Sequence, residues 1–378
     1  MASGCRGFPA RDETGTESGA GERERFRPAL RRRSLLTLAG VGLAAPFVWS
    51  RRADAAEQLF VRTPGGAYDR IRRTTIYEPF RKATGIQVVT VAATVGKLLA
   101  MFKAGGAQLD VIDTGNDPLY QLEKFNVLAP IPYDEFKFTD PANIEPAYKE
   151  KYQVGNFVYS SVLGYNTTVI PKGKEPQNWA EFWDLKKFPG PRELAGMASG
   201  DPSLEFALIA DGVPMDKLYP LDIPRAFRSL SRVRPAVKKF WDTGALSAEL
   251  LVDKEVVMGA LWHTRLYAAI AGGAPLAAQW NQNMIQVQAF GIVKGARHMD
   301  AAVKYLDYCV SAPVQARFCP PYNVGPINKK AFGMLPADFV DNAPGGPKLG
   351  PLGFLLDARW WADNRPQVTE YWNKWILG

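Results

Sequence analysis

Alternating strand-like and helix-like segments are the feature that most constrains the fold of this chain. A short strand is expected over Gln58–Arg62 and, after the turn Thr63–Gly66, a helix over Ala67–Ala83 with apolar residues at helical spacing. A β-branched strand over Ile86–Val91 and a further strand over Leu109–Asp113 repeat the pattern. Such alternation predicts βαβ units and a mainly parallel sheet, in which ligands bind beyond the carboxyl ends of the strands.

The rest of the chain continues this pattern and is long enough for two lobes. A strand is expected over Phe157–Tyr165 and an amphipathic helix over Met299–Ser311. Without its first 55 residues, the chain still has about 320 residues, which exceeds the size at which one hydrophobic core stops growing. Further helices are predicted around 179–183, 204–210, 224–231 and 234–243, and further strands over 255–261, 276–280 and 286–293.

The first 55 residues have the features of a cleavable export signal that follows a polar extension. Paired arginines within Arg31–Arg33 precede an apolar run, Leu35–Trp49, which is shorter than the about 20 residues that span a bilayer. Ala53–Ala55 has the small-x-small pattern of a signal-peptidase site, so we expect cleavage after Ala55 and a location in the periplasm. The paired arginines favour twin-arginine (Tat) export; a general secretion signal and an uncleaved anchor are the alternatives.

The charge of the chain excludes a strongly basic nucleic-acid-binding protein. The first 55 residues hold 10 of the 46 Lys and Arg residues and 6 of the 38 Asp and Glu residues, which leaves the remainder a net charge of only +4. This remainder has no concentrated basic tract, so nucleic acid is not an expected partner.

The sequence contains few groups with which to build a catalytic or metal site. The chain has only two histidines, without metal-ligand spacing, and it lacks a nucleophile elbow, a phosphate-binding loop and an HExxH motif. We therefore expect no catalytic residue, no metal and no cofactor. Two carboxylate pairs, Asp113 with Asp117 and Asp201 with Glu205, leave a secreted hydrolase as the alternative from another functional class.

Two cysteines follow the leader, Cys309 and Cys319. An oxidising periplasm would permit a disulfide between them. Two buried free thiols are the equal alternative, because Cys309 lies on a predicted helix among aliphatic neighbours.

Beyond the leader, nearly the whole chain resembles the solute-binding proteins of bacterial ABC importers, and most closely the spermidine/putrescine-type group. Each matching motif is short, but their order and spacing together are specific. The segments that carry the resemblance are Thr63–Tyr68, Glu78–Phe80, Thr84–Ile86, Asn178–Asp184, Ala210–Pro214, Leu218–Asp222, Gly325–Asn328, Leu356–Asp357 and Trp360–Trp361.

The resemblance implies an α/β, two-lobed periplasmic-binding-protein clamp of type II. Each lobe would be a mainly parallel sheet flanked by helices, with two hinge crossings near Tyr159–Leu163 and Gln288–Val293. Lobe 1 would comprise 56–160 plus 289–325, and lobe 2 would comprise 161–288 plus 326–378. A small-molecule solute would bind between the lobes, and closure would present a monomer to the membrane permease of an ABC importer.

The resemblance also places a ligand site. The family's cleft tryptophan matches Trp262, and its first-lobe aromatic residue matches Tyr68. An acidic residue before a second-lobe helix matches Asp201, and a cleft tyrosine is replaced by Asp117. The family's key carboxylate falls at Gln288, and the tryptophan two residues before it at Gln286.

These matches lead to two hypotheses for the ligand. Carboxylates and aromatic faces favour a small amine-bearing, polyamine-like solute. The lost carboxylate and the presence of Arg265 next to the cleft tryptophan keep an amino-acid-like or other anionic solute open, held by Arg265 and by the amides of Gly65 and Gly66 at a helix start. For the amine-bearing solute, the expected lining residues are Tyr68, Asp117, Asp201, Trp262, Gln288 and Tyr322.

Overall fold

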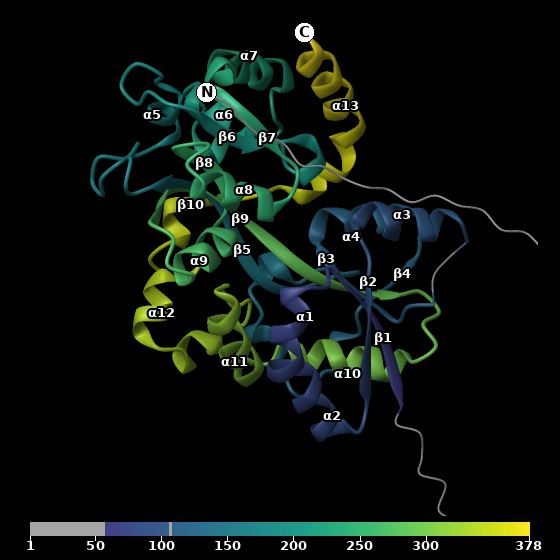
Figure 1. The fold of residues 1–378 in the computed structure, drawn as a ribbon. Coiled ribbons are helices and arrows are strands. Elements are labelled where there is room, and N and C mark those ends of the chain that lie inside the picture. The colour runs from purple at the N-terminus through teal and green to yellow at the C-terminus, as the bar shows by residue number, and fades with distance from the viewer. Residues whose placement is uncertain (1–56, 106–107) are drawn as a thin grey trace, which may run out of the picture. The chain divides into compact units, whose positions relative to one another are not determined.

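The structure, a computed structural model, describes residues 57–105 and 108–378. Ten strands within these ranges join one continuous sheet, with the central order β2-β1-β3-β9-β5-β8-β6-β7 (Figure 1). The predicted leader lies outside the described residues. None of the described helices is long and apolar enough to cross a membrane.

The two ends of the sheet repeat one arrangement, and each end belongs to one lobe. In lobe 1, three parallel strands lead to a long antiparallel strand, β9. In lobe 2, three parallel strands lead to a second antiparallel strand, β5. The predicted mainly parallel sheet is therefore present in both lobes. The strands are β1 (Gln58–Thr63), β2 (Gln87–Ala92), β3 (Val111–Gly115), β5 (Val154–Asn166), β6 (Arg192–Ala195), β7 (Val237–Trp241), β8 (Met258–Trp262) and β9 (Leu276–Val293), with the short β4 (Leu128–Ala129) and β10 (Gly353–Leu355) on β9.

The predicted first helix forms as three consecutive helical segments that end at Gly85. This glycine has φ 77°, a left-handed conformation that suits glycine and stops the helix. The helices are α1 (Ala67–Arg72), a π-helix (Arg73–Tyr77), α2 (Glu78–Thr84), α3 (Val95–Lys103), α4 (Asn116–Lys124), α5 (Trp179–Trp183), α6 (Leu204–Ala210), α7 (Ile223–Val233), α8 (Gly244–Val252), α9 (His263–Ala271), α10 (Met299–Cys309), α11 (Ala312–Tyr322), α12 (Ala337–Asn342) and α13 (Ala358–Leu377).

Strands β5 and β9 pair with each other and connect the lobes. They have 13 and 18 residues, far more than the five or six of an average strand. Val158 packs in the lobe 1 core, whereas Leu163 packs in a lobe 2 core. Along β9, the same change falls between Met284 and Ile285. Each strand therefore contributes to both cores.

The predicted lobe boundaries stay a prediction, and we propose to move two of them. Residues 288–292 of β9 pair with β3 of lobe 1, so we place the second crossing at Met284–Ile285 rather than near Gln288–Val293. Ile327 packs in the lobe 1 core, and the 3-10 segment Lys329–Met334 contacts α11. We place the return to lobe 2 near β10, where Phe354 joins the lobe 2 core.

Two predictions of local structure are wrong. The segment expected to be a helix around 234–243 instead contains β7, because Pro235 ends α7 and Val237–Trp241 pairs in parallel with β6. The two strands expected over 276–280 and 286–293 are one strand, β9: it pairs with β5 on both sides of an irregularity between Gln279 and Met284, and with β10 at residues 283–285.

Of the two alternatives for the cysteines, the structure has the free thiols. Cys309 and Cys319 are both buried and unbridged. Burial raises the pKa of the Cys309 thiol to about 12, which opposes thiolate formation. Both residues pack in the lobe 1 core.

Candidate ligand-binding site

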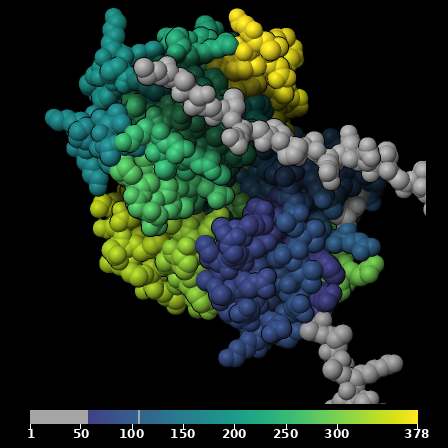
Figure 2. Space-filling model, in the orientation of Figure 1, coloured from purple at the N-terminus to yellow at the C-terminus, as the bar shows by residue number. Residues whose placement is uncertain are grey.

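A cavity of about 470 Å³ lies between the lobes, at the carboxyl ends of parallel strands from both. Lobe 1 contributes Thr114–Asp117 at the end of β3. Lobe 2 contributes Met197–Asp201 after β6 and Trp262 at the end of β8. The size suits a small organic ligand, and the position is where open α/β sheets bind their ligands. Figure 2 shows the purple surface of the α1 region next to the green surface of α8 and α9. Pro64, which precedes α1, and Thr264, which lies in α9, both line the cavity.

Four side chains on the hinge strands form the floor of this cavity. Phe157 and Tyr159 come from β5, and Gln286 and Gln288 come from β9. In each strand the two residues are separated by one position, so their side chains emerge on the same face. The register pairs Tyr159 with Gln286 and Phe157 with Gln288. The floor therefore consists of two aromatic residues beside two amides.

Aromatic rings line one side above the floor. The ring of Trp262 meets that of Tyr159 edge-on, with centroids 6.4 Å apart, and Tyr322 meets Phe157 at 5.7 Å. Trp262 also packs against Gly244, where an added Cβ would lie 2.6 Å from the indole. Trp262 can occupy this place only because Gly244 has no side chain.

The acidic side of the cavity contains Asp117 and Asp201. Arg365 of α13 forms an ion pair with Asp117 at 2.5 Å and donates to the carbonyl of Gly200 at 2.6 Å. Desolvation raises the pKa of Asp201 to about 7; Glu205 and Asp117 add to this shift, and Arg365 opposes it. A cationic ligand group would favour the ionised form of Asp201.

Two arginines lie on the lining outside this acidic side. Arg62 is buried, and its guanidinium donates to the carbonyls of Asp113, at 2.6 Å, and Ala93. Arg265 on α9 is exposed, and its charge opposes a rise in the pKa of Tyr322 that desolvation causes. The cavity thus has carboxylates and guanidinium groups among its lining residues.

A buried polar network supports the floor from within lobe 1. Arg72 and Asp113 are both fully buried and lie 3.8 Å apart at their nearest charged atoms. Tyr68 donates from its hydroxyl to Asp113, Arg72 donates to Tyr68 at 2.9 Å, and Asn156 also donates to Tyr68, at 3.0 Å. Gln288 donates to Asp113 at 2.7 Å, which connects this network to the cavity.

Of the eight ligand-binding residues expected from the sequence, six lie together in the cavity lining. They are Asp117, Asp201, Trp262, Arg265, Gln288 and Tyr322.

The other two do not line the cavity. Tyr68 is only 3% exposed, because its ring packs in the core and its hydroxyl donates a hydrogen bond to Asp113. Gly66 is exposed at the start of α1, and the cavity reaches only the neighbouring Pro64.

Sequence reasoning missed Arg365, Arg62 and Tyr159 as lining residues. Alternation along the first hinge strand could have indicated Tyr159, because it shares a face with Phe157. Arg365 has no local signal: it is 248 residues from Asp117, and only the packing of α13 brings the two together.

The carboxylate pairs do not form a hydrolytic site. Asp113 is fully buried behind the floor, so only Asp117 of the first pair reaches the cavity. In the second pair, Glu205 is buried and accepts hydrogen bonds from Tyr219 and Trp361, both at 2.7 Å. Among residues 57–105 and 108–378, no group of three or more His, Cys, Asp or Glu side chains is arranged to hold a metal ion.

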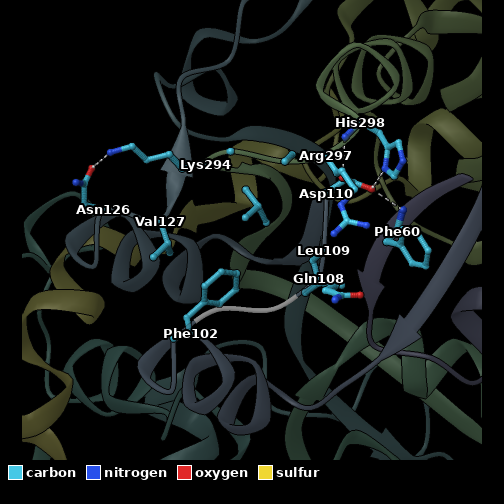
Figure 3. Close-up of a pocket in the computed structure, with 14 residues that line it drawn as sticks. Phe60, Phe102, Gln108, Leu109, Asp110, Asn126, Val127, Lys294, Arg297 and His298 are labelled. Carbon is cyan, nitrogen blue, oxygen red and sulfur yellow. Dashed lines mark hydrogen bonds and ion pairs between the residues drawn. The ribbon is translucent and has the colours of Figure 1, made fainter.

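A second cavity, of about 770 Å³, lies at the opposite end of β3 (Figure 3). Several of its polar groups have hydrogen-bond partners within or beside the lining. Asp110 accepts from the backbone amides of Phe60, at 2.9 Å, and His298, at 3.1 Å, while Lys294 donates to Asn126 at 3.2 Å. Since its lining residues all come from lobe 1, the interlobe cavity is the better candidate for a clamp that closes on its ligand.

Comparison with known proteins gives one consistent result. Residues 75–345 match a family described as bacterial extracellular solute-binding protein. The γ-aminobutyric acid (GABA)-binding protein of Pseudomonas aeruginosa is 29% identical over 350 residues, which are 90% of this chain and 96% of the relative.

Two solved structures cover the same range. An ABC transporter substrate-binding protein from Bradyrhizobium japonicum is 31% identical, with a TM-score of 0.77 over 85% of this chain and 99% of that one. The binding protein AgtB from Agrobacterium tumefaciens, in complex with agropinic acid, is 29% identical, with a TM-score of 0.73 over the same shares, 85% and 99%. The similarity therefore spans both lobes.

Proposed function

Because the chain belongs to the family of bacterial extracellular solute-binding proteins, we propose that its interlobe cavity binds a small amino-acid-like solute carrying an amine and an acid group. The protein is the solute-binding component of an ABC importer and, like its family, not an enzyme. Its fold is the α/β periplasmic-binding-protein fold expected from the sequence.

The observation that carries this proposal is the presence of both charges in one cavity. Asp201 lies on the side that Asp117 shares with Arg365, and Arg265 adds a cation with no ion-pair partner in the described part of the chain. A ligand ammonium group would be attracted to Asp201, and a ligand carboxylate to Arg265. The ligands named for two relatives are compatible with this proposal: one relative is named for GABA, and one was solved with agropinic acid.

The same residues make a polyamine the weaker candidate. A polyamine needs a carboxylate for each of its ammonium groups, and Arg365 already neutralises Asp117. The position where the spermidine/putrescine-type group has its key carboxylate is the neutral Gln288. We therefore rank the amino-acid-like solute above the polyamine-like solute that the sequence first suggested.

Titration calorimetry of the purified protein with GABA, putrescine, spermidine and butyrate tests this ranking. We expect GABA to bind and to raise the melting temperature by mass action, with butyrate and the polyamines much weaker. Tight binding of putrescine or spermidine, with none of GABA, would overturn the proposal in favour of a polyamine.

We also propose that the protein reaches the periplasm by the Tat route, acts there as a monomer and docks on its permease in the closed form. The support for the route is the Arg31–Arg33 motif, which lies outside the described residues. Substitution of Arg32 and Arg33 by Lys should leave the precursor in the cytoplasm, as judged by cell fractionation. Normal export of that double variant would contradict the Tat assignment.

A further inference from the structure

Two glutamines on the hinge strand β9 lie side by side on the cavity floor. Gln286 and Gln288 share one face of the strand, next to the point where the chain passes from one lobe to the other. Each contributes a neutral amide, with two N–H donors and one carbonyl acceptor.

The orientation of both amides is determined by carboxylates, of which Asp113 is fully buried and Asp201 half-buried. Gln288 donates from Nε2 to Asp113 at 2.7 Å, and Gln286 donates from Nε2 to Asp201 at 2.5 Å. In both contacts the amide nitrogen is the donor, so it faces the aspartate. The oxygens Oε1 consequently point away from the two aspartates.

At least one of these oxygens lacks a partner. Gln286 is 1% exposed, and in the described part of the chain its Oε1 has no hydrogen-bond partner. A buried acceptor without a donor is unfavourable, and native proteins seldom retain one without a reason. Since Gln286 lines the cavity, a ligand donor is the simplest group to satisfy it.

The two amides are anchored from opposite lobes. Asp113 belongs to lobe 1, where Arg72, Tyr68 and Asn156 surround it. Asp201 belongs to lobe 2 and follows β6. A ligand group that contacts both amide oxygens would therefore be positioned relative to both lobes.

We propose that the side-chain oxygens of Gln286 and Gln288 form the subsite for the ligand's ammonium group and select a primary amine by its N–H donors. This proposal rests on the proposed function and adds the residues that recognise the amine. Because both amide oxygens are neutral, they discriminate between ligands by hydrogen bonding, whereas Asp201 provides the attraction between opposite charges. A quaternary ammonium ion has the same charge but no N–H group and should bind poorly.

The experiment measures affinities of three probes by calorimetry: GABA, its N-trimethyl analogue and butylamine. The variants are Gln288→Met and Gln286→Met, which keep the side-chain length and remove the acceptor. We expect each variant to weaken the affinity for GABA by about 10- to 100-fold, the effect of losing a hydrogen bond to a charged group. The affinity for the trimethyl analogue should change by less than about threefold.

Gln279→Met is the matched control. Gln279 lies on the same strand, outside the cavity lining, and its amide donates to Gln177 and accepts from the backbone N–H of Asn281. It should leave all three affinities unchanged. Gln288→Met is the variant more certain to fold, because Asp113 keeps its other donors. Melting temperatures verify folding of all three variants.

The outcomes separate this inference from the proposed function. Equal losses for GABA and its trimethyl analogue would show that the glutamines only fill space, and would overturn the inference alone. Binding of butylamine but not of GABA, lost in Gln288→Met, would overturn the amino-acid-like ligand and support the subsite. Binding of none of the three probes by the unmodified protein would overturn both.

Discussion

The two lobes hold their sides of the cavity in different ways. Behind the lobe 1 side lies a closed network of buried groups, in which Asp113 receives hydrogen bonds from Tyr68, Asn156 and Gln288 and faces Arg72. On the lobe 2 side, Asp201 is half-buried, and Gln286 is the one hydrogen-bond donor to its carboxylate among the described contacts. Lobe 1 is therefore organised before the ligand binds, whereas in lobe 2 the carboxylate of Asp201 gains its cationic partner from the ligand.

The largest effect is expected from removing the cation of the lobe 1 network. Arg72→Met leaves Asp113 as a buried charge without its partner, which should lower the free energy of unfolding by about 3–5 kcal/mol. Chemical denaturation measures this. The double variant Arg72→Met with Asp113→Asn should recover part of the loss, because no buried charge remains. A loss below about 1 kcal/mol in the single variant would contradict an organised lobe 1 network.

The next effect concerns Trp262, the aromatic lining residue at the end of β8 in lobe 2. Trp262→Ala removes a ring that touches both Tyr159 and the cavity, so GABA affinity should fall by at least about 30-fold, the scale of a binding hot spot. Calorimetry measures the affinity. Trp360→Ala is the matched control, because that half-buried ring packs on Tyr219 away from the cavity. Similar losses in both variants would point to a general loss of lobe 2 packing.

A smaller effect concerns protonation of Asp201. Its folded-state pKa, about 7, lies above the ordinary value of 3.8, so its contribution to stability is full below about pH 4 and is lost as the pH rises towards 7. The charged groups around it are Arg365, Glu205 and Asp117. A bound ammonium ion lowers this pKa again, so GABA binding near pH 6.5 should release up to about one proton.

Calorimetry in buffers of different ionisation enthalpy measures the released proton. Asp201→Asn should abolish the release, because the amide does not titrate. Proton uptake on binding, or release that persists in Asp201→Asn, would contradict the view that the ligand provides the cationic partner of Asp201.

The smallest effect is expected at the surface of lobe 2. Arg232 forms an ion pair with Asp211 at 2.5 Å, but its side chain is half exposed and Arg225 pairs with the same carboxylate. Arg232→Ala should therefore lower the free energy of unfolding by less than about 1 kcal/mol. A loss as large as that of Arg72→Met, measured by chemical denaturation, would remove the contrast between the buried network and the exposed pairs.

Much of the fold could be predicted because its signals are local. The first strand and helix, the stop at Gly85 and the position of Trp262 at a strand end all follow from residue types within a few positions. One of the two wrong local predictions, β7, shows the limit: pairing with β6 decided its conformation.

The candidate site was predictable only where it follows the ends of strands. Asp117 and Trp262 come directly after or at the end of parallel strands, which the alternation locates. Tyr68 occupies a similar position in the sequence, yet its ring turns into the core because the buried Asp113 accepts a hydrogen bond from its hydroxyl. Local position predicts where a side chain begins, and its partners decide where it points.

The sequence by itself determined the alternation of strands and helices, because periodic burial and turn glycines act over short distances along the chain, and its length indicated two lobes. Only the tertiary structure decided how the cavity presents its groups. The amide of Gln286 is oriented by a carboxylate 85 residues away, and that of Gln288 by one 175 residues away. Such orientations depend on hydrogen bonds that exist only after the lobes have packed, so no local pattern encodes them.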